Sequence, residues 1–150
     1  MVRVEPHATA LADGVDAALP GWVERSVARV LTAWQGGTPD PEVLDAAREA
    51  GLRAQAEVGA AVRTLVQADI DAQRTTPLAL LRSAVRYPTR ILQEAGVPPV
   101  ERDPMQVRLL PDDLYDLSPA SFADVDPALA EPGLVWGAAK ALAHRRRHLP

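Results

Sequence analysis

An unbroken alternation of small and apolar residues between positions 41 and 73 constrains the fold of this chain most strongly. These residues recur at steps of three and four. They are Leu44, Ala47, Gly51, Ala54, Val58, Ala61, Leu65, Ala68 and Ala72. Such steps place side chains along one face of an α-helix and are typical of helices that pack lengthwise against others. The pattern therefore predicts one long helix over residues 41–73.

The residues between these positions support the same helix. Four further apolar residues widen the stripe, and they are Leu52, Val62, Val66 and Ile70. Glu49, Arg53 and Glu57 carry alternating charge at a spacing of four residues, which is typical of a solvent-exposed helix face. A helix of this length exceeds what a compact domain needs, so we expect a kink near Gly51 or Gly59.

Two helices are expected before the long one. The apolar residues of the first are Leu11, Val15 and Ala18, and those of the second are Val23, Val27, Val30 and Trp34. The first is a weak helix over residues 8–18, and Pro20 suits the start of the second. Gly36 is expected to end this second helix. Asp40 and Pro41 then provide the N-cap and the first position of the long helix.

A further helical region follows the long helix and contains a proline. Thr76 and Pro77 suit its N-cap and first position. Pro88 removes a backbone donor and clashes with the carbonyl group four residues earlier, so we expect a break or kink there. The piece beyond it is predicted to end at Gly96, because glycine readily adopts the left-handed conformation that closes many helices.

Residues 96–127 form a proline-rich acidic segment. Prolines at 98, 99, 104, 111, 119 and 127 forbid long helices, and no alternation favours strands. The acids of the segment are Glu101, Asp103, Asp112, Asp113, Asp116, Asp124 and Asp126. Apolar residues such as Leu114, Tyr115 and Phe122 make the segment too hydrophobic for a free linker. We therefore expect it to lie extended across the helices, before a last helix that opens near Pro127.

These elements predict an all-α fold, a small helical bundle with one long helix and the irregular acidic segment packed across it. We expect a single domain over residues 1–150, with loose ends at 1–7 and 145–150. Alanine is the most frequent hydrophobic residue and favours thin, closely packed helices. The tryptophans at 22, 34 and 136 are interpreted as core or interface anchors.

Composition excludes several classes of function. The chain has no cysteine, so disulfides and thiolate chemistry are impossible. The formal net charge of −4 argues against general affinity for nucleic acid. The N-terminal residues do not resemble a secretory signal, and no apolar run is long enough to cross a membrane, so we expect a cytoplasmic protein. His144 and His148 are spaced like zinc ligands, but they lie in a basic run and are interpreted as surface charge.

No catalytic signature, metal site or cofactor motif is recognisable. The aspartates do not follow the calcium-loop pattern of alternating oxygen ligands around a central glycine. All three histidines lie near the ends of the chain, at His7, His144 and His148, which does not favour a general base. The sequence therefore predicts a protein that is not an enzyme.

A cluster of arginines is the one candidate binding surface. No acidic residue lies between positions 72 and 93. This stretch holds Arg74, Thr76, Arg82, Arg86 and Arg90. The last three arginines recur every four residues and would share a helix face, near the free amides of a helix start at Thr76. They could hold an acidic partner or a phosphate, or they could be neutralised by the acids of residues 100–126, which we favour.

Five short runs of sequence resemble a family of small helical proteins of actinobacteria that have no assigned activity. The runs are Gln73-Arg-Thr-Thr-Pro-Leu-Ala-Leu-Leu-Arg82, Arg86-Tyr-Pro-Thr89, Gly96-Val-Pro-Pro99, Pro111-Asp-Asp113 and Trp136-Gly-Ala-Ala-Lys140. The likeness covers about residues 65–147. It implies no catalytic or binding residues.

The sequence therefore predicts a non-enzymatic protein-interaction or adaptor module that engages another protein through its arginines. The alternative is a small regulatory domain that binds a phosphorylated ligand or nucleic acid at the same residues. A nucleic-acid partner is possible but is not favoured by the net charge.

Overall fold

The computed structural model describes residues 5–68, 77–101 and 113–130 of the chain, with side chains from residue 9 and excluding those of 66–68. Every regular element in these ranges is a helix, which confirms the all-α prediction. The α-helices are α1 (Glu5–Gln35), α2 (Pro41–Ala54), α3 (Ala60–Ala68), α4 (Pro77–Ser83), α5 (Arg86–Glu94) and α6 (Phe122–Val125). A π-helical turn, η1 (Gln55–Gly59), joins α2 to α3, and a 3₁₀ turn, η2 (Pro127–Leu129), follows α6.

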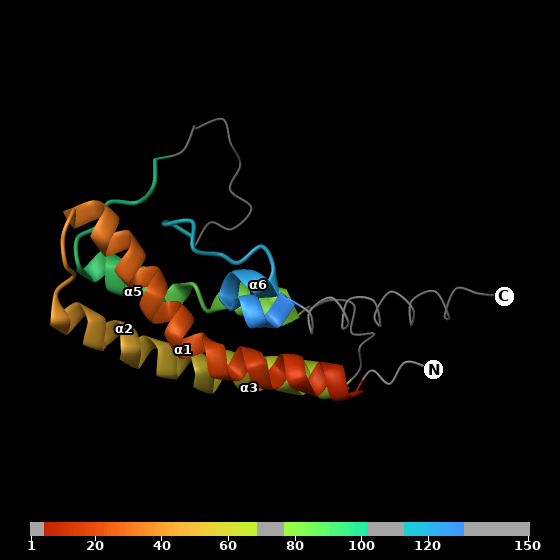
Figure 1. Ribbon diagram of the computed structural model, residues 1–150. Coiled ribbons are helices and arrows are strands. Elements are labelled where there is room, and N and C mark those ends of the chain that lie inside the picture. Colours follow the sequence, from red (N-terminus) through yellow and green to blue (C-terminus); the bar gives the residue numbers. More distant parts are fainter. Residues whose placement is uncertain (1–4, 69–76, 102–112, 131–150) are drawn as a thin grey trace.

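Two long helical rods organise the molecule. α1 runs in one direction, and α2, η1 and α3 return beside it as one continuous rod (Figure 1). α5 packs against both α1 and α2, while α4 contacts α3 and η1. α6 lies against α1. No helix among the described residues combines the length and apolarity that a membrane span requires.

The core side of α1 is a single row of aliphatic residues. The row is Leu11, Val15, Leu19, Val23, Val27 and Leu31, and each of them is at most 1% exposed. A fully buried aliphatic side chain of this size contributes about 1.5–3 kcal/mol. The row therefore fixes which face of α1 meets α2, α3 and α5.

α1 corrects three sequence predictions. It is one helix with Pro20 inside it, where we expected two helices and a start at Pro20. It begins at Glu5, within the range that we expected to be loose. Trp34, assigned to the apolar face, is 45% exposed, because the row of buried residues drifts around the helix and leaves position 34 outside it. Trp22 does lie in the core.

The predicted seam of the second rod is largely confirmed. Ala47, Gly51, Ala54 and Val58 are buried, whereas Leu44, Ala61 and Leu65 are partly buried. The helix does not continue as a uniform α-helix, because η1 widens it between the two glycines at which we expected a kink. The prediction that Leu52 belongs to the apolar stripe of this helix is wrong, since its side chain is 55% exposed.

A break in this helical region is confirmed, but it lies at residues 84–85 and not at Pro88, where we expected it. α4 ends at Ser83 and α5 begins at Arg86, so Pro88 lies in the first turn of α5, where a missing amide leaves no hydrogen bond unmade. α5 ends at Glu94, and Gly96, with a φ of 82°, closes it as predicted. The amides of Gly96 and Val97 donate to Gln93 and Leu92, each at 3.0 Å, which is the double closure typical of a glycine-terminated helix.

The described parts of the acidic segment pack on the helices, as predicted. Tyr115, Leu117 and Val125 are each at most 4% exposed. The Asp113 carboxylate accepts hydrogen bonds from the amides of Leu117 at 2.7 Å and Ser118 at 2.9 Å. This buried carboxylate therefore holds a turn of the segment and is not available to an arginine of the cluster.

Candidate functional site

The structure places three of the five predicted site residues. Arg74 and Thr76 lie outside the described residues. Arg82 is in α4, whereas Arg86 and Arg90 are in α5, so the break between the two helices interrupts the predicted stripe. Each of the three arginines has a different kind of partner.

Within the described part of the chain, Arg82 is the arginine of the cluster that contacts the acidic segment. Its Nε donates a hydrogen bond to the backbone carbonyl of Pro119 at 3.2 Å, and the contact is partly buried. The acceptor is a peptide oxygen and not a carboxylate. Arg82 is therefore a structural residue that ties the segment to α4.

Arg86 belongs to a cluster with Tyr87 and Glu57. Its Nη2 lies 2.8 Å from Glu57 Oε2 and 3.1 Å from the Tyr87 hydroxyl, and the guanidinium carbon lies 5.0 Å from the centre of the Tyr87 ring. The Tyr87 hydroxyl also donates a hydrogen bond to Glu57. This hydrogen bond, together with the charge of Arg86, lowers the pKa of Glu57 below its ordinary value. The cluster joins α5 to η1.

Arg90 is the most exposed of the three. Its side chain is 76% exposed and pairs with Glu94, one turn later in α5, at 3.2 Å. An acid that follows its base by four residues is the weaker of the two orders on a helix. This pair therefore holds Arg90 only loosely.

Among the described residues, the carboxylates that pair with Arg86 and Arg90 come from Glu57 and Glu94. Both lie outside residues 100–126, whose acids we expected to neutralise the arginines. The described part of that segment instead uses Asp113, Asp124 and Asp126 on its own backbone amides. These short-range hydrogen bonds close turns, so those carboxylates do not reach the arginines.

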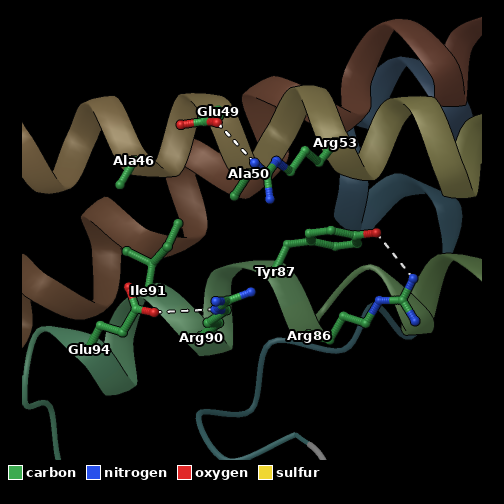
Figure 2. Close-up of a pocket in the computed structure, with 9 residues that line it drawn as sticks. All are labelled: Ala46, Glu49, Ala50, Arg53, Arg86, Tyr87, Arg90, Ile91 and Glu94. Atoms are coloured by element: carbon green, nitrogen blue, oxygen red, sulfur yellow. Dashed lines mark hydrogen bonds and ion pairs between the residues drawn. The ribbon is translucent and has the colours of Figure 1, made fainter.

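Arg86 and Arg90 line a groove between α2 and α5 (Figure 2). The groove has a volume of about 390 Å³. Its apolar lining comes from Ala46, Ala50, Ile91 and the ring of Tyr87, and its charged lining from Glu49, Arg53, Arg86, Arg90 and Glu94. Across it, α2 and α5 place Arg53 and Arg90 on opposite sides, with the Tyr87 ring between them (Figure 2).

Acidic and basic side chains alternate along this groove. Arg53 lies beside Glu49 on α2 and Arg90 lies beside Glu94 on α5, while Arg86 lies beyond the Tyr87 ring (Figure 2). Arg53 pairs with Glu49 at 3.2 Å, with both side chains well exposed. The groove thus combines a small apolar floor with guanidinium groups whose present partners are exposed carboxylates.

Sequence reasoning missed the α2 half of this site. Glu49 and Arg53 were assigned to an outer helix face, which is correct, but nothing in the pattern showed that α5 lies beside that face. Tyr87 was not predicted as a site residue. One sequence feature could have indicated this neighbour. Glu49, Arg53 and Glu57 form an exposed row of charges, and such a row can pair with the arginines of a second helix.

No group of three or more histidine, aspartate and glutamate residues is gathered for a metal in the described ranges. No family model, curated protein or solved structure matches this chain. The resemblance to small actinobacterial proteins therefore stays a prediction, and the function has to be argued from the groove itself.

Proposed function

We propose that this protein is a non-enzymatic interaction module and that its α2–α5 groove binds an acidic segment of a partner protein. The observation that carries the proposal is the placement of Arg53 and Arg90 on opposite sides of an apolar floor (Figure 2). A carboxylate that enters between them can accept hydrogen bonds from either guanidinium group, which presents several donors in one plane.

The present ion pairs oppose such binding only weakly. The Arg53–Glu49 and Arg90–Glu94 pairs are both between exposed side chains of one helix. Pairs of this kind typically contribute about 0.3–0.5 kcal/mol. Exchanging Glu94 for a carboxylate of the partner therefore costs little, and the apolar floor adds burial that the free groove lacks.

The positions of the arginines indicate where the bound segment places its acids. Its carboxylates are expected at Arg53, Arg86 and Arg90, where they replace the glutamates of the chain itself. The apolar floor favours a peptide over a polyanion such as nucleic acid, because a peptide can bury apolar side chains there between its acids. An acidic peptide therefore suits the groove better than nucleic acid or a phosphorylated ligand, the alternative that the sequence left open.

A short fluorescein-labelled peptide of alternating glutamate and leucine tests the proposal by fluorescence anisotropy. We expect this peptide to bind the wild type. A peptide with glutamine in place of glutamate should bind at least about tenfold more weakly, which corresponds to a loss of ~1.4 kcal/mol in binding free energy. The charge reversal Arg90→Glu should lower the affinity for the glutamate peptide by a similar factor. Arg48→Glu is the matched control, since Arg48 is an exposed arginine of α2 outside the groove.

Two results would contradict the proposal. One is equal binding of the glutamate and glutamine peptides, and the other is equal loss in the Arg90→Glu and Arg48→Glu variants. A labelled single-stranded oligonucleotide provides the remaining comparison. If it binds more tightly than the peptide, with a steep dependence of affinity on salt, the alternative function replaces this one.

A further inference from the structure

Each arginine of the α2–α5 groove already pairs with a carboxylate of this chain. The pairs are Arg53–Glu49, Arg86–Glu57 and Arg90–Glu94. The first and the last of these pairs join residues of one helix, whereas the Glu57 carboxylate reaches Arg86 of α5 from η1. The groove is therefore neutralised from within, and a partner has to compete with these glutamates for the arginines.

Glu57 is held more firmly than the other two glutamates. Its Oε2 lies 2.8 Å from Arg86 Nη2 and also accepts a hydrogen bond from the Tyr87 hydroxyl. This hydrogen bond, followed by the charges of Arg86 and Arg53, lowers the pKa of Glu57, so the carboxylate is ionised at neutral pH. Hydrogen bonds to an ionised acceptor are stronger than those between neutral groups. Of the three glutamates, Glu57 therefore competes most strongly with a partner.

Arg86 lines the groove, but its ionic partner lies outside the lining. Glu57 belongs to η1 and is not a lining residue, whereas Arg86 and Tyr87 are. Figure 2 shows the Arg86 guanidinium group beside the Tyr87 hydroxyl. A partner carboxylate that approached Arg86 there would meet the charge of Glu57, and like charges at one guanidinium group repel each other. Arg86 therefore contributes little to binding while Glu57 stays in place.

The contact between Glu57 and Arg86 is accessible to a competing carboxylate. The two side chains are 60% and 59% exposed, so neither charge is buried when the pair separates. The position of α5 does not depend on this contact alone, because Ile91 and Leu92 anchor the helix in the core. Exchange of Glu57 for an acid of a partner is therefore compatible with the fold.

We propose that Glu57, held by the Tyr87 hydroxyl, is an intramolecular competitor that keeps Arg86 from the acids of the partner. This inference rests on the proposed function of the α2–α5 groove and adds a regulation of the same site. The partner first meets the arginines whose carboxylates are loosely held, Arg53 and Arg90, and gains Arg86 only when the competitor is displaced. The groove thus favours segments rich in acids over segments with few, since only the former can also replace Glu57.

Fluorescence anisotropy with the labelled glutamate–leucine peptide tests this proposal, at neutral pH and low ionic strength. Glu57→Gln should raise the affinity for the peptide by about two- to fivefold, which is the range expected for the loss of one exposed ion pair. Tyr87→Phe keeps the aromatic floor and should raise the affinity by a smaller factor. The combined variant should bind no more tightly than Glu57→Gln, because the hydroxyl acts through Glu57.

A double-mutant cycle between positions 57 and 86 separates competition from a general effect of charge. In the wild type, Arg86→Gln should lower the affinity by less than about twofold, because Glu57 already neutralises Arg86. In the Glu57→Gln background, Arg86→Gln should abolish the gain in affinity. Glu24→Gln is the matched control, because Glu24 of α1 pairs with Arg48 of α2 at 3.4 Å and neither residue lines the groove. It removes the same charge and should change the affinity much less than Glu57→Gln.

Three results would overturn the proposal and leave the proposed function intact, provided that Arg90→Glu still weakens binding. They are a lower affinity of Glu57→Gln, equal gains in Glu57→Gln and Glu24→Gln, and a gain in Glu57→Gln that persists without Arg86. Circular dichroism melts of all variants ensure that a change in binding does not reflect a loss of folding. A peptide that binds neither the wild type nor Glu57→Gln would reject the proposed function and the intramolecular competitor together.

Discussion

The side-chain amide of Gln55 donates a hydrogen bond to the backbone carbonyl of Asp16 at 2.5 Å. In an uninterrupted α-helix this carbonyl would accept from the amide of residue 20, but Pro20 has no amide hydrogen. Gln55 lies in η1, the π-helical turn of the neighbouring rod. One helix thus supplies the donor that a proline removes from the other. α1 is also visibly bent along its length (Figure 1).

Replacing Gln55 by alanine should lower the free energy of unfolding by about 1 kcal/mol, because the partly buried carbonyl of Asp16 loses its partner. Pro20→Ala restores the backbone donor within α1. In the Pro20→Ala background, Gln55→Ala should therefore lower the free energy of unfolding by less than about half of its effect in the wild type. Urea denaturation of the four proteins in this double-mutant cycle measures the coupling. Equal costs in both backgrounds would show that the hydrogen bond does not compensate for the proline.

Gly51 lies where the backbones of α1 and α2 are too close for a side chain between them. A Cβ atom at this position would lie 2.6 Å from the Cα and 2.7 Å from the carbonyl oxygen of Pro20. Alanine normally stabilises a helix relative to glycine by up to about 1 kcal/mol. Here the clash is with backbone that cannot move aside, so Gly51→Ala should destabilise the protein by about 1–3 kcal/mol.

Gly37→Ala is the matched control, because no atom lies within 4 Å of a Cβ built there. It should change the free energy of unfolding by no more than about 0.5 kcal/mol. Thermal melts followed by circular dichroism compare the two variants. A stabilised Gly51→Ala protein would mean that the two rods separate more easily than the contact suggests.

Thr89 carries a buried hydroxyl group that has no hydrogen-bond partner among the described residues. Its residue is only 6% exposed, so the hydroxyl loses contact with water without compensation. Thr89→Val replaces this group by a methyl of similar shape and should raise the free energy of unfolding by about 1 kcal/mol. In Thr64→Val, by contrast, the lost hydroxyl is exposed and bonded to the Ala60 carbonyl, so little change is expected. A destabilised Thr89→Val would indicate that the hydroxyl has a partner in solution.

Local chemistry explains which features of the fold could be predicted from the sequence. The start of α2 depends on Asp40 and Pro41, and the Asp40 carboxylate does accept the amide of Glu42 at 2.9 Å. The end of α5 depends on Gly96, whose positive φ was anticipated. These features arise within a few residues of each other, so a sequence pattern contains all the information they need.

The features that could not be predicted depend on distant partners. Pro20 was read as a helix start because the compensating donor, Gln55, belongs to another element. Arg86 was expected to meet the acidic segment, but its carboxylate comes from Glu57, 29 residues earlier in the chain. The groove itself requires α2 and α5 to lie side by side, and the amphipathic pattern of each helix does not specify its neighbour on the polar face.

The cluster of Glu57, Arg86 and Tyr87 should make stability depend on acid. The Tyr87 hydrogen bond and the nearby Arg86 lower the pKa of Glu57 in the folded protein from its ordinary value of 4.5. A carboxyl group whose pKa is lowered on folding stabilises the protein above its unfolded-state pKa and loses this contribution as the pH falls through the folded-state value. The contribution is therefore complete at neutral pH and disappears below 4.5.

Glu57→Gln should remove this part of the acid sensitivity. Urea denaturation at neutral pH and at several values below 4.5 should show a shallower loss of stability in the variant than in the wild type. Glu42→Gln is the comparison, because Glu42 is an exposed glutamate in the first turn of α2 and lies outside the groove. The effect should be small, since the cluster is exposed and salt screens it, so the slopes are best compared at low ionic strength. Parallel slopes for the wild type and Glu57→Gln would show that Glu57 is not held by Tyr87 and Arg86, and Arg86 would then be as free for a partner as Arg90.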